Sequence, residues 1–493
     1  MSKTMLPKEW INTNLGAILL SIIGGGTPSK SKPEYFLGNI PWMSVKDMNK
    51  HILKDTIDHI TPDAVKNSST NIIPAGTPII ATRMSLGKIV TASFDSAINQ
   101  DLKALFLPKD IERNFFLHWY RSQSQLIESL GTGTTVKGIR LEVLNGLSIN
   151  LPPLAEQKII ADKLDDLLAR VDSIKARLGN IPELLKKFRH SVLLSAVSGK
   201  LTAEWRNENK TSESAKELVV RWISLRKERF SIYQNELLAL GDLKRTKKFI
   251  EPHLPDIETG GELVVPPSWE IVSVSQIADC LDSQRIPVKK EKRIKSEGLY
   301  PYFGANGEVD RVDDFIFNGD YVLVTEDETF YGRVKPIAYR YTGKCWVNNH
   351  VHILSAPTKS ANDYLCYALM YYKIIPWLTG TTGRAKLTQA ALNVLPIGLP
   401  PEKEIEEIVL RIDQFFSYAD SIQRAANNAL ARINNLTQSI LAKAFCGELT
   451  AQWREENLDL ISGINSAEAL LQKISTEKLA SGTSKKIVKK VVR

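Results

Sequence analysis

The 493-residue sequence predicts an α+β fold: two α/β domains with twisted β-sheets, separated by two long helices that pack on each other with pseudo-two-fold symmetry. Three observations lead to this fold class. A long segment occurs twice in the chain. Both copies carry apolar residues at the heptad spacing of packed helices. The region before each copy is rich in short β-like runs separated by turn residues.

Internal repetition is the most informative of these observations. The first copy begins LPPLAEQKIIADKLDDLLARVDSI at Leu151, and the second begins LPPEKEIEEIVLRIDQFFSYADSI at Leu399. The copies align without a gap at an offset of 248 residues, and both end on LTAxWRxEN. A match of this length excludes chance, so the chain contains a duplication.

The regions around the two copies set the expected domain order. LPKEW at Leu6 matches VPPSW at Val265, and NQDLKAL at Asn99 resembles NNHVHIL at Asn348. Proline and glycine in EPHLPDIETGG mark a boundary between the halves. We therefore expect a domain over 1–150, a helix over 151–209, a charged helical linker over 210–262, a second domain over 263–398, a second helix over 399–457, and a C-terminal region with a basic tail over 458–493.

Each copy has the pattern of one face of a long helix. The apolar positions alternate at spacings of four and three residues, and those of the second copy lie 248 residues after those of the first. Two matching stripes are most simply buried against each other. The seam consists of Ile160, Leu164, Leu167, Val171, Ile174, Leu178, Ile181, Leu185, Phe188 and Val192, followed by Ile408, Ile412, Phe415, Ala419, Ile422, Ala426, Ala429, Ile433, Leu436 and Ile440.

Helix-breaking residues mark the limits of these helices. Pro182 lacks a backbone donor and clashes with the preceding turn, so we expect the first helix to kink or restart there. Gly199 and Gly447 follow the seams where a left-handed C-terminal cap is favourable. The seam residues alone leave the direction of pairing open, and a helical hairpin inside an ordinary core is a further interpretation.

Composition argues against several classes of protein. The content of 43% hydrophobic and 24% charged residues is typical of globular domains. Apolar runs stay well below the roughly 18 residues of a membrane helix, and MSKTMLPKEW has no signal-peptide core. We therefore expect a cytoplasmic protein with no membrane partner.

Cysteine, histidine and charge usage add little that is specific. The four cysteines are widely spaced without a CxxC pair, which argues against a zinc site and a disulfide framework. His350 and His352 would share one strand face but have no ligand at metal spacing, so we expect no metal site. Of the net charge of +9, five come from Lys485–Arg493, a tail of the kind that is usually solvated and disordered.

The repeat motifs LPPLAEQ and LTAxWR resemble those of the specificity subunits of type I restriction–modification systems, and the resemblance covers nearly the whole chain. GGTPSK at Gly25, GTGTTVKGI at Gly131 and YPYFGANGEVDRVDDFIFNGD at Tyr300 resemble segments of that family's target recognition domains. The resemblance implies two target recognition domains, each reading one half of a split double-stranded DNA site. It also implies that the two helices form an antiparallel coiled coil that sets the spacer. The seam from Ile160 to Val192, about 48 Å long, matches roughly 14 base pairs.

The resemblance also implies partners. Two methyltransferase subunits would methylate adenine N6 with S-adenosylmethionine, and two restriction subunits would use ATP and magnesium. This chain would be non-catalytic and bind none of these cofactors. The sequence contains neither an NPP[FY] motif nor a GxxxxGK[ST] loop, which argues against a methyltransferase or nuclease with its own chemistry. The other alternative is a bipartite DNA-binding regulator without enzyme partners.

Candidate DNA-binding residues are cations and amides near expected turns, because Lys and Arg bind phosphates while Arg and Asn suit guanine and adenine edges. Arg83 and Lys88 flank a strand–turn pattern whose alternative is a solvated hairpin tip. Arg285, Lys289 and Arg293 lie in a basic run whose alternative is a solvated face. The remaining candidates are Lys30 and Lys46 in the first domain, and Tyr302, Asn306 and Arg333 in the second.

A Gly/Thr-rich loop precedes each repeat. GTGTTVKG contains Thr134 and Lys137, and TGTTGRAK contains Arg384 and Lys386. Backbone amides and hydroxyls followed by a cation suit a phosphate, although each loop can equally be a turn into a packed element.

Each repeat ends on a Trp-Arg pair, Trp205 with Arg206 and Trp453 with Arg454. These pairs are candidates for docking the methyltransferase subunit. The alternative is that they cap the helix pair.

Overall fold

The computed structural model describes residues 6–133, 136–209, 212–241, 248–261, 263–288, 298–327, 330–381 and 385–491. The chain divides into two compact units. Unit 1 comprises Met1–Gly179 and Asn427–Arg493, and unit 2 comprises Asn180–Ala426. Each unit therefore contains one predicted β-rich domain and parts of both repeats.

Unit 1 is built on mixed sheets. One has the strand order β2-β10-β7-β8-β4 and another the order β5-β3-β9-β6, while β1 and β11 form an antiparallel pair. The pair joins the start of the domain to the strand that leads into LPP. The strands are β1 (Ile11–Asn14), β2 (Ser21–Gly24), β3 (Ile40–Met43), β4 (Ile52–Leu53), β5 (Asp58–Ile60), β6 (Asn71–Ile73), β7 (Ile79–Ala81), β8 (Ile89–Ala92), β9 (Ser96–Ile98), β10 (Leu102–Phe106) and β11 (Ser148–Leu151).

Helices cover the unit-1 sheet and connect it to the repeats. Phe115, Phe116, Trp119 and Tyr120 of α3 are buried in the main core of the unit, so aromatic side chains fill the space between sheet and helices. Glu112 caps α3 by accepting from the backbone of Phe115. The helices are α1 (Leu15–Ile18), α2 (Pro62–Lys66), α3 (Arg113–Ser122), α4 (Ser124–Ser129), α5 (Leu141–Asn145), α6 (Leu154–Gly179), the second half of α14 (Glu402–Phe445), α15 (Ala451–Glu456) and α16 (Ala467–Val491), with short 3-10 turns at Pro33–Phe36, Val45–Asp47, Leu458–Leu460 and Gly463–Asn465.

Unit 2 repeats this plan with longer strands. Its sheet has the order β13-β18-β16-β17-β14-β15, and β12 pairs with β19 antiparallel as β1 does with β11. The strands are β12 (Glu270–Ser273), β13 (Asp279–Cys280), β14 (Tyr300–Gly304), β15 (Gly307–Val312), β16 (Phe317–Thr325), β17 (Ala338–Val347), β18 (Val351–Ser355) and β19 (Pro396–Leu399). The helices are α7 (Ile181–Val197), α8 (Ala203–Glu208), α9 (Ala215–Ala239), α10 (Ile257–Gly260), α11 (Val274–Ile277), α12 (Lys359–Met370), α13 (Gln389–Val394) and the first half of α14, with 3-10 turns at Asp282–Gln284 and Ile375–Trp377.

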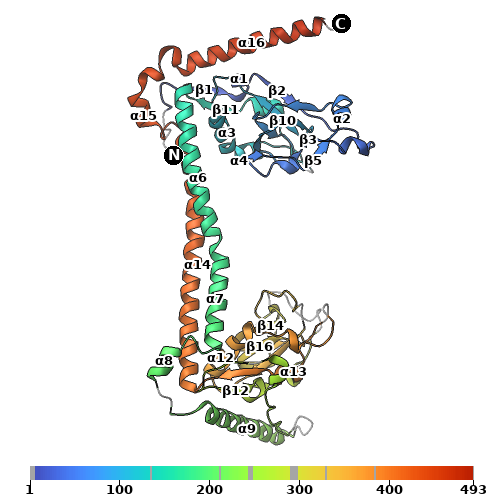
Figure 1. The fold of residues 1–493 in the computed structure, drawn as a ribbon, viewed down its shortest axis with the longest axis vertical. Coiled ribbons are helices and arrows are strands. Elements are labelled where there is room, and N and C mark those ends of the chain that lie inside the picture. Colours follow the sequence, from blue (N-terminus) through green and yellow to red (C-terminus); the bar gives the residue numbers. More distant parts are fainter. Residues whose placement is uncertain are drawn as a thin grey trace. The chain divides into compact units, whose positions relative to one another are not determined.

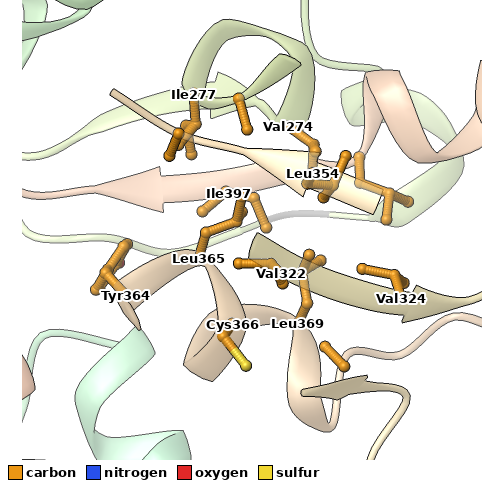
Figure 2. Close-up of a cluster of buried hydrophobic side chains, with 14 of the residues drawn as sticks. Val274, Ile277, Val322, Val324, Leu354, Tyr364, Leu365, Cys366, Leu369 and Ile397 are labelled. Atoms are coloured by element: carbon orange, nitrogen blue, oxygen red, sulfur yellow. The ribbon is translucent and has the colours of Figure 1, made fainter. Parts of the chain in front are cut away.

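The strand β16 explains how the unit-2 sheet is buried on both faces. Val322 and Val324 belong to the cluster with helix α12, whereas Leu323 belongs to a separate cluster with Val347. Alternate residues of a strand point to opposite faces, so the apolar run YVLVT is required when both faces are covered. Figure 2 shows Leu365, Cys366 and Leu369, which belong to α12, beside Val322 of β16.

The repeat helices pair antiparallel within each unit, which confirms the direction that the resemblance implies. In unit 2, Phe188 of α7 packs against Phe415 of α14 with ring centroids 5.9 Å apart, and Arg411 donates to Leu201 O at 2.8 Å. In unit 1, Ile160 and Leu164 of α6 share a buried cluster with Leu441 and Ala444 of α14. Figure 1 shows α6 and α7 each lying beside α14.

The predicted seam is buried unevenly. Ile160, Val192 and Ile412 are buried, but Ile174, Phe415 and Leu436 are 45%, 38% and 50% exposed. A helix pair alone covers only part of each seam side chain, whereas α3 packs on α6, and α12 on α7, near the ends. The heptad pattern is therefore real. Large seam side chains are buried mainly near the ends, while Ala419 and Ala426 are small enough to be buried within the helix pair.

Both predictions about helix limits are confirmed. Helix α6 ends at Gly179, and α7 starts at Ile181 with Pro182 in its first turn, where a missing backbone donor costs little. Gly199 and Gly447 follow α7 and α14 with φ of +71° and +87°. These are left-handed conformations that favour glycine.

Helix α9, expected as a linker of unknown role, is an integral part of unit 2 and has a counterpart in α16 of unit 1. Leu218 and Trp222 are fully buried, as is Ile474 of α16. Arg226 donates to Ser275 O of α11 at 2.6 Å, and Lys478 donates to Gly16 O of α1 at 2.7 Å. Each cation thus donates to a carbonyl of the short helix that follows the first strand of its own unit. The duplication therefore extends beyond the LTAxWR motif.

Two further expectations concern the tail and the cysteines. The backbone of α16 is helical through Val491, so most of the tail Lys485–Arg493 continues a helix instead of forming an irregular end. All four cysteines are free, and burial raises the pKa of Cys345 and of Cys366 to about 12. Within the described residues, no helix has both the length and the apolar character needed to cross a bilayer.

We predict that Gly447→Ala destabilises the protein whereas Gly179→Ala does not. A Cβ at Gly447 would lie 2.5 Å from Pro7 Cγ at φ +87°, whereas a Cβ at Gly179 meets no described atom within 4 Å. Alanine at position 447 should lower the free energy of unfolding by about 2 kcal/mol or more. Alanine at position 179, at the end of a helix, should leave it unchanged or raise it. Chemical denaturation of both variants measures the difference. Equal midpoints would contradict the close contact at Gly447.

Candidate nucleic-acid interface

A buried carboxylate joins three distant segments at the base of unit 1. Glu156 is fully buried at the start of α6 and accepts hydrogen bonds from Trp10 Nε1 at 2.8 Å and from Thr450 Oγ1 at 2.6 Å. Arg454 forms an ion pair with the same carboxylate and lies over the Trp10 ring. We call Trp10, Glu156, Thr450 and Arg454 the unit-1 clasp.

Unit 2 contains the same arrangement. Glu404, at the start of α14, accepts from Trp269 Nε1 at 3.0 Å, from Thr202 Oγ1 at 2.7 Å and from Arg206 Nη2 at 2.7 Å. Arg206 lies 5.6 Å from the centroid of the Trp269 ring. Trp269, Glu404, Thr202 and Arg206 form the unit-2 clasp.

The clasps account for the arginines of the Trp-Arg pairs. Arg206 and Arg454 satisfy buried glutamates and also donate to the carbonyls of Gly199 and Gly447. This arrangement favours the capping interpretation for both arginines, because their guanidinium groups are already bound inside the protein. The neighbouring Trp205 and Trp453 are half-buried, and their docking role stays a prediction.

Four loop segments of unit 1 meet at one end of its strands. Gly26 N donates to Ile98 O at 3.0 Å, and Thr82 N donates to Asp101 O at 2.9 Å. Arg83 contacts Asp101 at 3.5 Å and forms a bridge with Gly138. We call segments 24–32, 83–88, 99–101 and the described parts of 131–138 the unit-1 rim.

Three of these segments have counterparts in unit 2 with the same connections. Glu326 N donates to His350 O at 3.0 Å, as Thr82 does to Asp101. Asp327 forms a bridge with Lys386, as Arg83 does with Gly138. Asn348 accepts from His350 N, as Asn99 does from Asp101 N. We call 348–350, the described parts of 326–333 and 379–387, and segment 304–306, which stands where unit 1 has 44–46, the unit-2 rim.

The two rims differ in their side chains. Arg83 and Asp101 of unit 1 stand where unit 2 has Asp327 and His350, which lie 2.6 Å apart. Gly138 of the Gly/Thr loop stands where unit 2 has Lys386. One backbone thus supports two different patterns of donors and acceptors, as two domains that read different base sequences require.

The unit-1 candidates divide between the rim and elsewhere. Arg83, Lys88 and Lys137 are exposed in the rim, and Lys30 is exposed in its first segment. Lys46 lies in the turn Val45–Asp47, at the position that Asn306 occupies in unit 2, and forms an ion pair with Asp58 at 3.2 Å. Thr134 lies outside the described residues.

The unit-2 candidates are more strongly engaged within the protein. Arg333 donates to Asn306 Oδ1 at 2.9 Å, so these two candidates contact each other in the rim. Lys386 forms an ion pair with Glu326 at 2.8 Å. Lys289, Arg293 and Arg384 lie outside the described residues.

Two unit-2 candidates require correction. Tyr302 is fully buried in β14, so its ring cannot reach a base edge. Arg285 is 12% exposed and is bound to Glu326 at 2.7 Å and to Val351 O at 2.6 Å. Both were chosen because they lie near polar or basic sequence, whereas their partners are far along the chain. Arg285 thus holds Glu326 of the unit-2 rim in place.

A buried polar network underlies the unit-2 rim. Burial by itself would raise the pKa of Glu326, but hydrogen bonds from Lys386 and Arg285 overcome it and lower the pKa. His352 contacts Asp282 through Nδ1 at 2.5 Å and Leu387 O through Nε2 at 2.8 Å. Cys280, Asp282 and His352 have donor atoms within 4.8 Å of one another. Because both nitrogens of His352 already have protein partners, these contacts describe a hydrogen-bonded network.

Some rim residues were missed by the sequence reasoning. Gln100 contacts Thr27, Asp101 contacts Arg83, and His350 contacts Asp327. The aligned strings NQD and NNH contain three of them, so comparing the two halves position by position would have found these sites. The candidates were taken from cations and from Gly-rich strings, and these two strings contain neither.

Two domains that share a rim backbone, differ in rim side chains and stand on equivalent clasps define a bipartite recognition protein. The comparisons with known proteins agree. The family model for the type I restriction modification DNA specificity domain matches residues 7–183 and 266–432. The chain belongs to this family and is a specificity subunit of the type I restriction–modification kind.

Relatives extend over the full length. The chain is 32% identical to the type I restriction enzyme StySPI specificity subunit of Salmonella potsdam, with 99% of this chain and 100% of the relative covered. It is 33% identical to the EcoKI specificity subunit of Escherichia coli K12, with the same coverage. A solved HsdS subunit from Thermoanaerobacter tengcongensis shares the fold, with a TM-score of 0.51 and 18% identity over 91% of this chain and 99% of that chain.

We predict that Glu156→Gln and Glu404→Gln each destabilise the protein, whereas Glu455→Gln does not. Each clasp glutamine would leave a largely buried guanidinium without its carboxylate, at a cost of about 3–5 kcal/mol. Glu455 is exposed on α15 and serves as the matched control. Denaturation midpoints of the three variants test this. A clasp variant as stable as the control would show that the carboxylate is dispensable.

Proposed function

We propose that this chain reads a split double-stranded DNA site, with each target recognition domain contacting one half-site through its rim. The equivalence of the two rims carries the proposal. They share the hydrogen bond from Thr82 or Glu326 N and the bridge to the Gly/Thr loop, while Arg83 and Asp101 are replaced by Asp327 and His350. A shared backbone that carries different side chains in the two units suits two different half-sites.

The antiparallel repeat helices are proposed to set the spacer between the half-sites. Helix α14 alone contains 44 residues, or about 66 Å at about 1.5 Å per residue. A helical spacer suits this role because its length is fixed by its number of residues and not by a flexible coil.

The partners are proposed from the family. The chain would be a non-catalytic scaffold for two methyltransferase subunits, which use S-adenosylmethionine to methylate adenine N6, and for two restriction subunits, which use ATP and magnesium. The chain itself would bind none of these cofactors. The absence of NPP[FY] and GxxxxGK[ST] strings from the sequence supports this division.

Mapping methylated adenines in the host genome by long-read sequencing tests the function. We expect one bipartite motif that disappears when the gene for this chain is deleted. Arg83→Ala should relax the motif in one half-site only, because loss of a base contact costs about 1–3 kcal/mol. Lys200→Ala, an exposed cation beyond α7 and outside both rims, is the control and should leave the motif unchanged. A host motif that survives deletion would refute the function.

Docking by the half-buried tryptophans has its own test. If Trp205 and Trp453 contact the methyltransferase subunit, Trp205→Ala combined with Trp453→Ala should reduce co-purification of that subunit at least severalfold. The double variant leaves both clasp glutamates with their partners, so its denaturation midpoint is the accompanying control. Unchanged assembly would remove the docking role, and failure of the wild-type chain to capture any methyltransferase would favour the regulator alternative.

A further inference from the structure

A strained turn in the unit-1 rim presents an apolar side chain to solvent. Among the residues that the structure describes, Met84 is the single non-glycine residue with positive φ, at +66°. Ser85 N donates to Arg83 O at 2.8 Å, so residues 83–85 form a γ-turn of the rare, strained kind. The Met84 side chain is 63% exposed. Neither the backbone conformation nor the exposure benefits the folded state.

Packing on several sides fixes this turn. Met84 N donates to Lys137 O at 3.0 Å, which joins the turn to the Gly/Thr loop. Leu86 is buried so close to Gly131 that a Cβ there would lie 2.3 Å from Leu86 Cδ1. A Cβ on Gly87 would lie 2.7 Å from Ser124 O. Strained backbone persists where its surroundings over-determine it, and such positions cluster at binding sites.

Three cationic residues lie in rim positions next to the exposed methionine. Arg83 precedes it, Lys88 follows the turn, and Lys137 supplies the carbonyl that holds it. All three side chains are exposed. An exposed apolar group with cations in neighbouring positions suits a polyanion that has an apolar surface between its charges. Duplex DNA is such a polyanion, because thymine methyl groups and base faces lie between the phosphate rows.

We propose that Met84 is a specificity-determining residue of unit 1, whose side chain contacts base edges in a groove while Lys88 and Lys137 bind the flanking phosphates. The inference rests on the proposed function and adds Met84 to the residues that contact base edges. Apolar contact discriminates thymine, with its methyl group, from cytosine. A turn already fixed in the free protein limits the entropy lost on binding.

The test uses the assembled complex of the full chain with the host methyltransferase subunits. The probes are a fluorescent duplex carrying the site mapped by methylation, a series with each base pair changed in turn, and an unrelated duplex. Met84→Gly removes the side chain and fits positive φ, Met84→Leu keeps an apolar group, and Leu37→Ala removes an exposed apolar side chain outside the rim.

Met84→Gly should bind the mapped duplex about tenfold more weakly while its affinity for the unrelated duplex stays unchanged. Its base-pair profile should flatten at one or two adjacent positions of one half-site. Its denaturation midpoint should not fall, since glycine relieves the turn. Met84→Leu and Leu37→Ala should stay within about threefold of wild type.

Three results would overturn the inference: wild-type affinity and profile for Met84→Gly, equal weakening on mapped and unrelated duplexes, or the same loss in Leu37→Ala. Failure of the proposed function is distinguishable from these. In that case the wild-type complex itself would show no preference for the mapped duplex, whatever residue stands at position 84.

Discussion

The structure depends on two buried glutamates that each hold together segments from both repeats. Glu156 and Arg454 are 298 residues apart in sequence, yet they form one ion pair inside unit 1. A buried carboxylate is costly unless its oxygens are fully satisfied, and here an indole, a hydroxyl and a guanidinium satisfy them. Glu404 in unit 2 takes the same three kinds of donor. Each recognition domain therefore has a rigid base completed by the other half of the sequence.

This rigid base makes variation at the rims compatible with one fold. The backbone hydrogen bonds that shape the rims involve main-chain atoms of Thr82, Asp101, Glu326 and His350, so they persist whatever side chains stand there. Replacement of Arg83 by an acidic counterpart, Asp327, alters what a partner meets without altering the path of the chain. The turn at Met84 is also fixed by its surroundings. Packing of Leu86 and Gly87 holds the positive φ of Met84, a backbone conformation that a residue with a side chain disfavours.

Much of the architecture was predictable because local patterns encode it. The duplication, the heptad stripes, the restart at Pro182 and the caps at Gly199 and Gly447 each depend on neighbouring residues in the chain. The site was less predictable. Tyr302 and Arg285 looked like DNA-binding residues, but burial in β14 and pairing with Glu326 come from tertiary contacts. The role of α9 likewise became evident only once Trp222 was seen in the core.

The cations of the two rims differ in how they are paired within the protein, and this difference affects how binding depends on salt. In unit 2, Lys386 and Arg285 are paired with Glu326, and Arg333 with an amide oxygen, whereas in unit 1 Arg83 touches Asp101 only at 3.5 Å. Fewer condensed counterions are displaced from a polyanion by cations whose charge is already neutralised. Under the proposed function, rising ionic strength should therefore loosen the half-site bound by unit 1 before the half-site bound by unit 2, and the two ends of one target would respond differently to the same salt concentration.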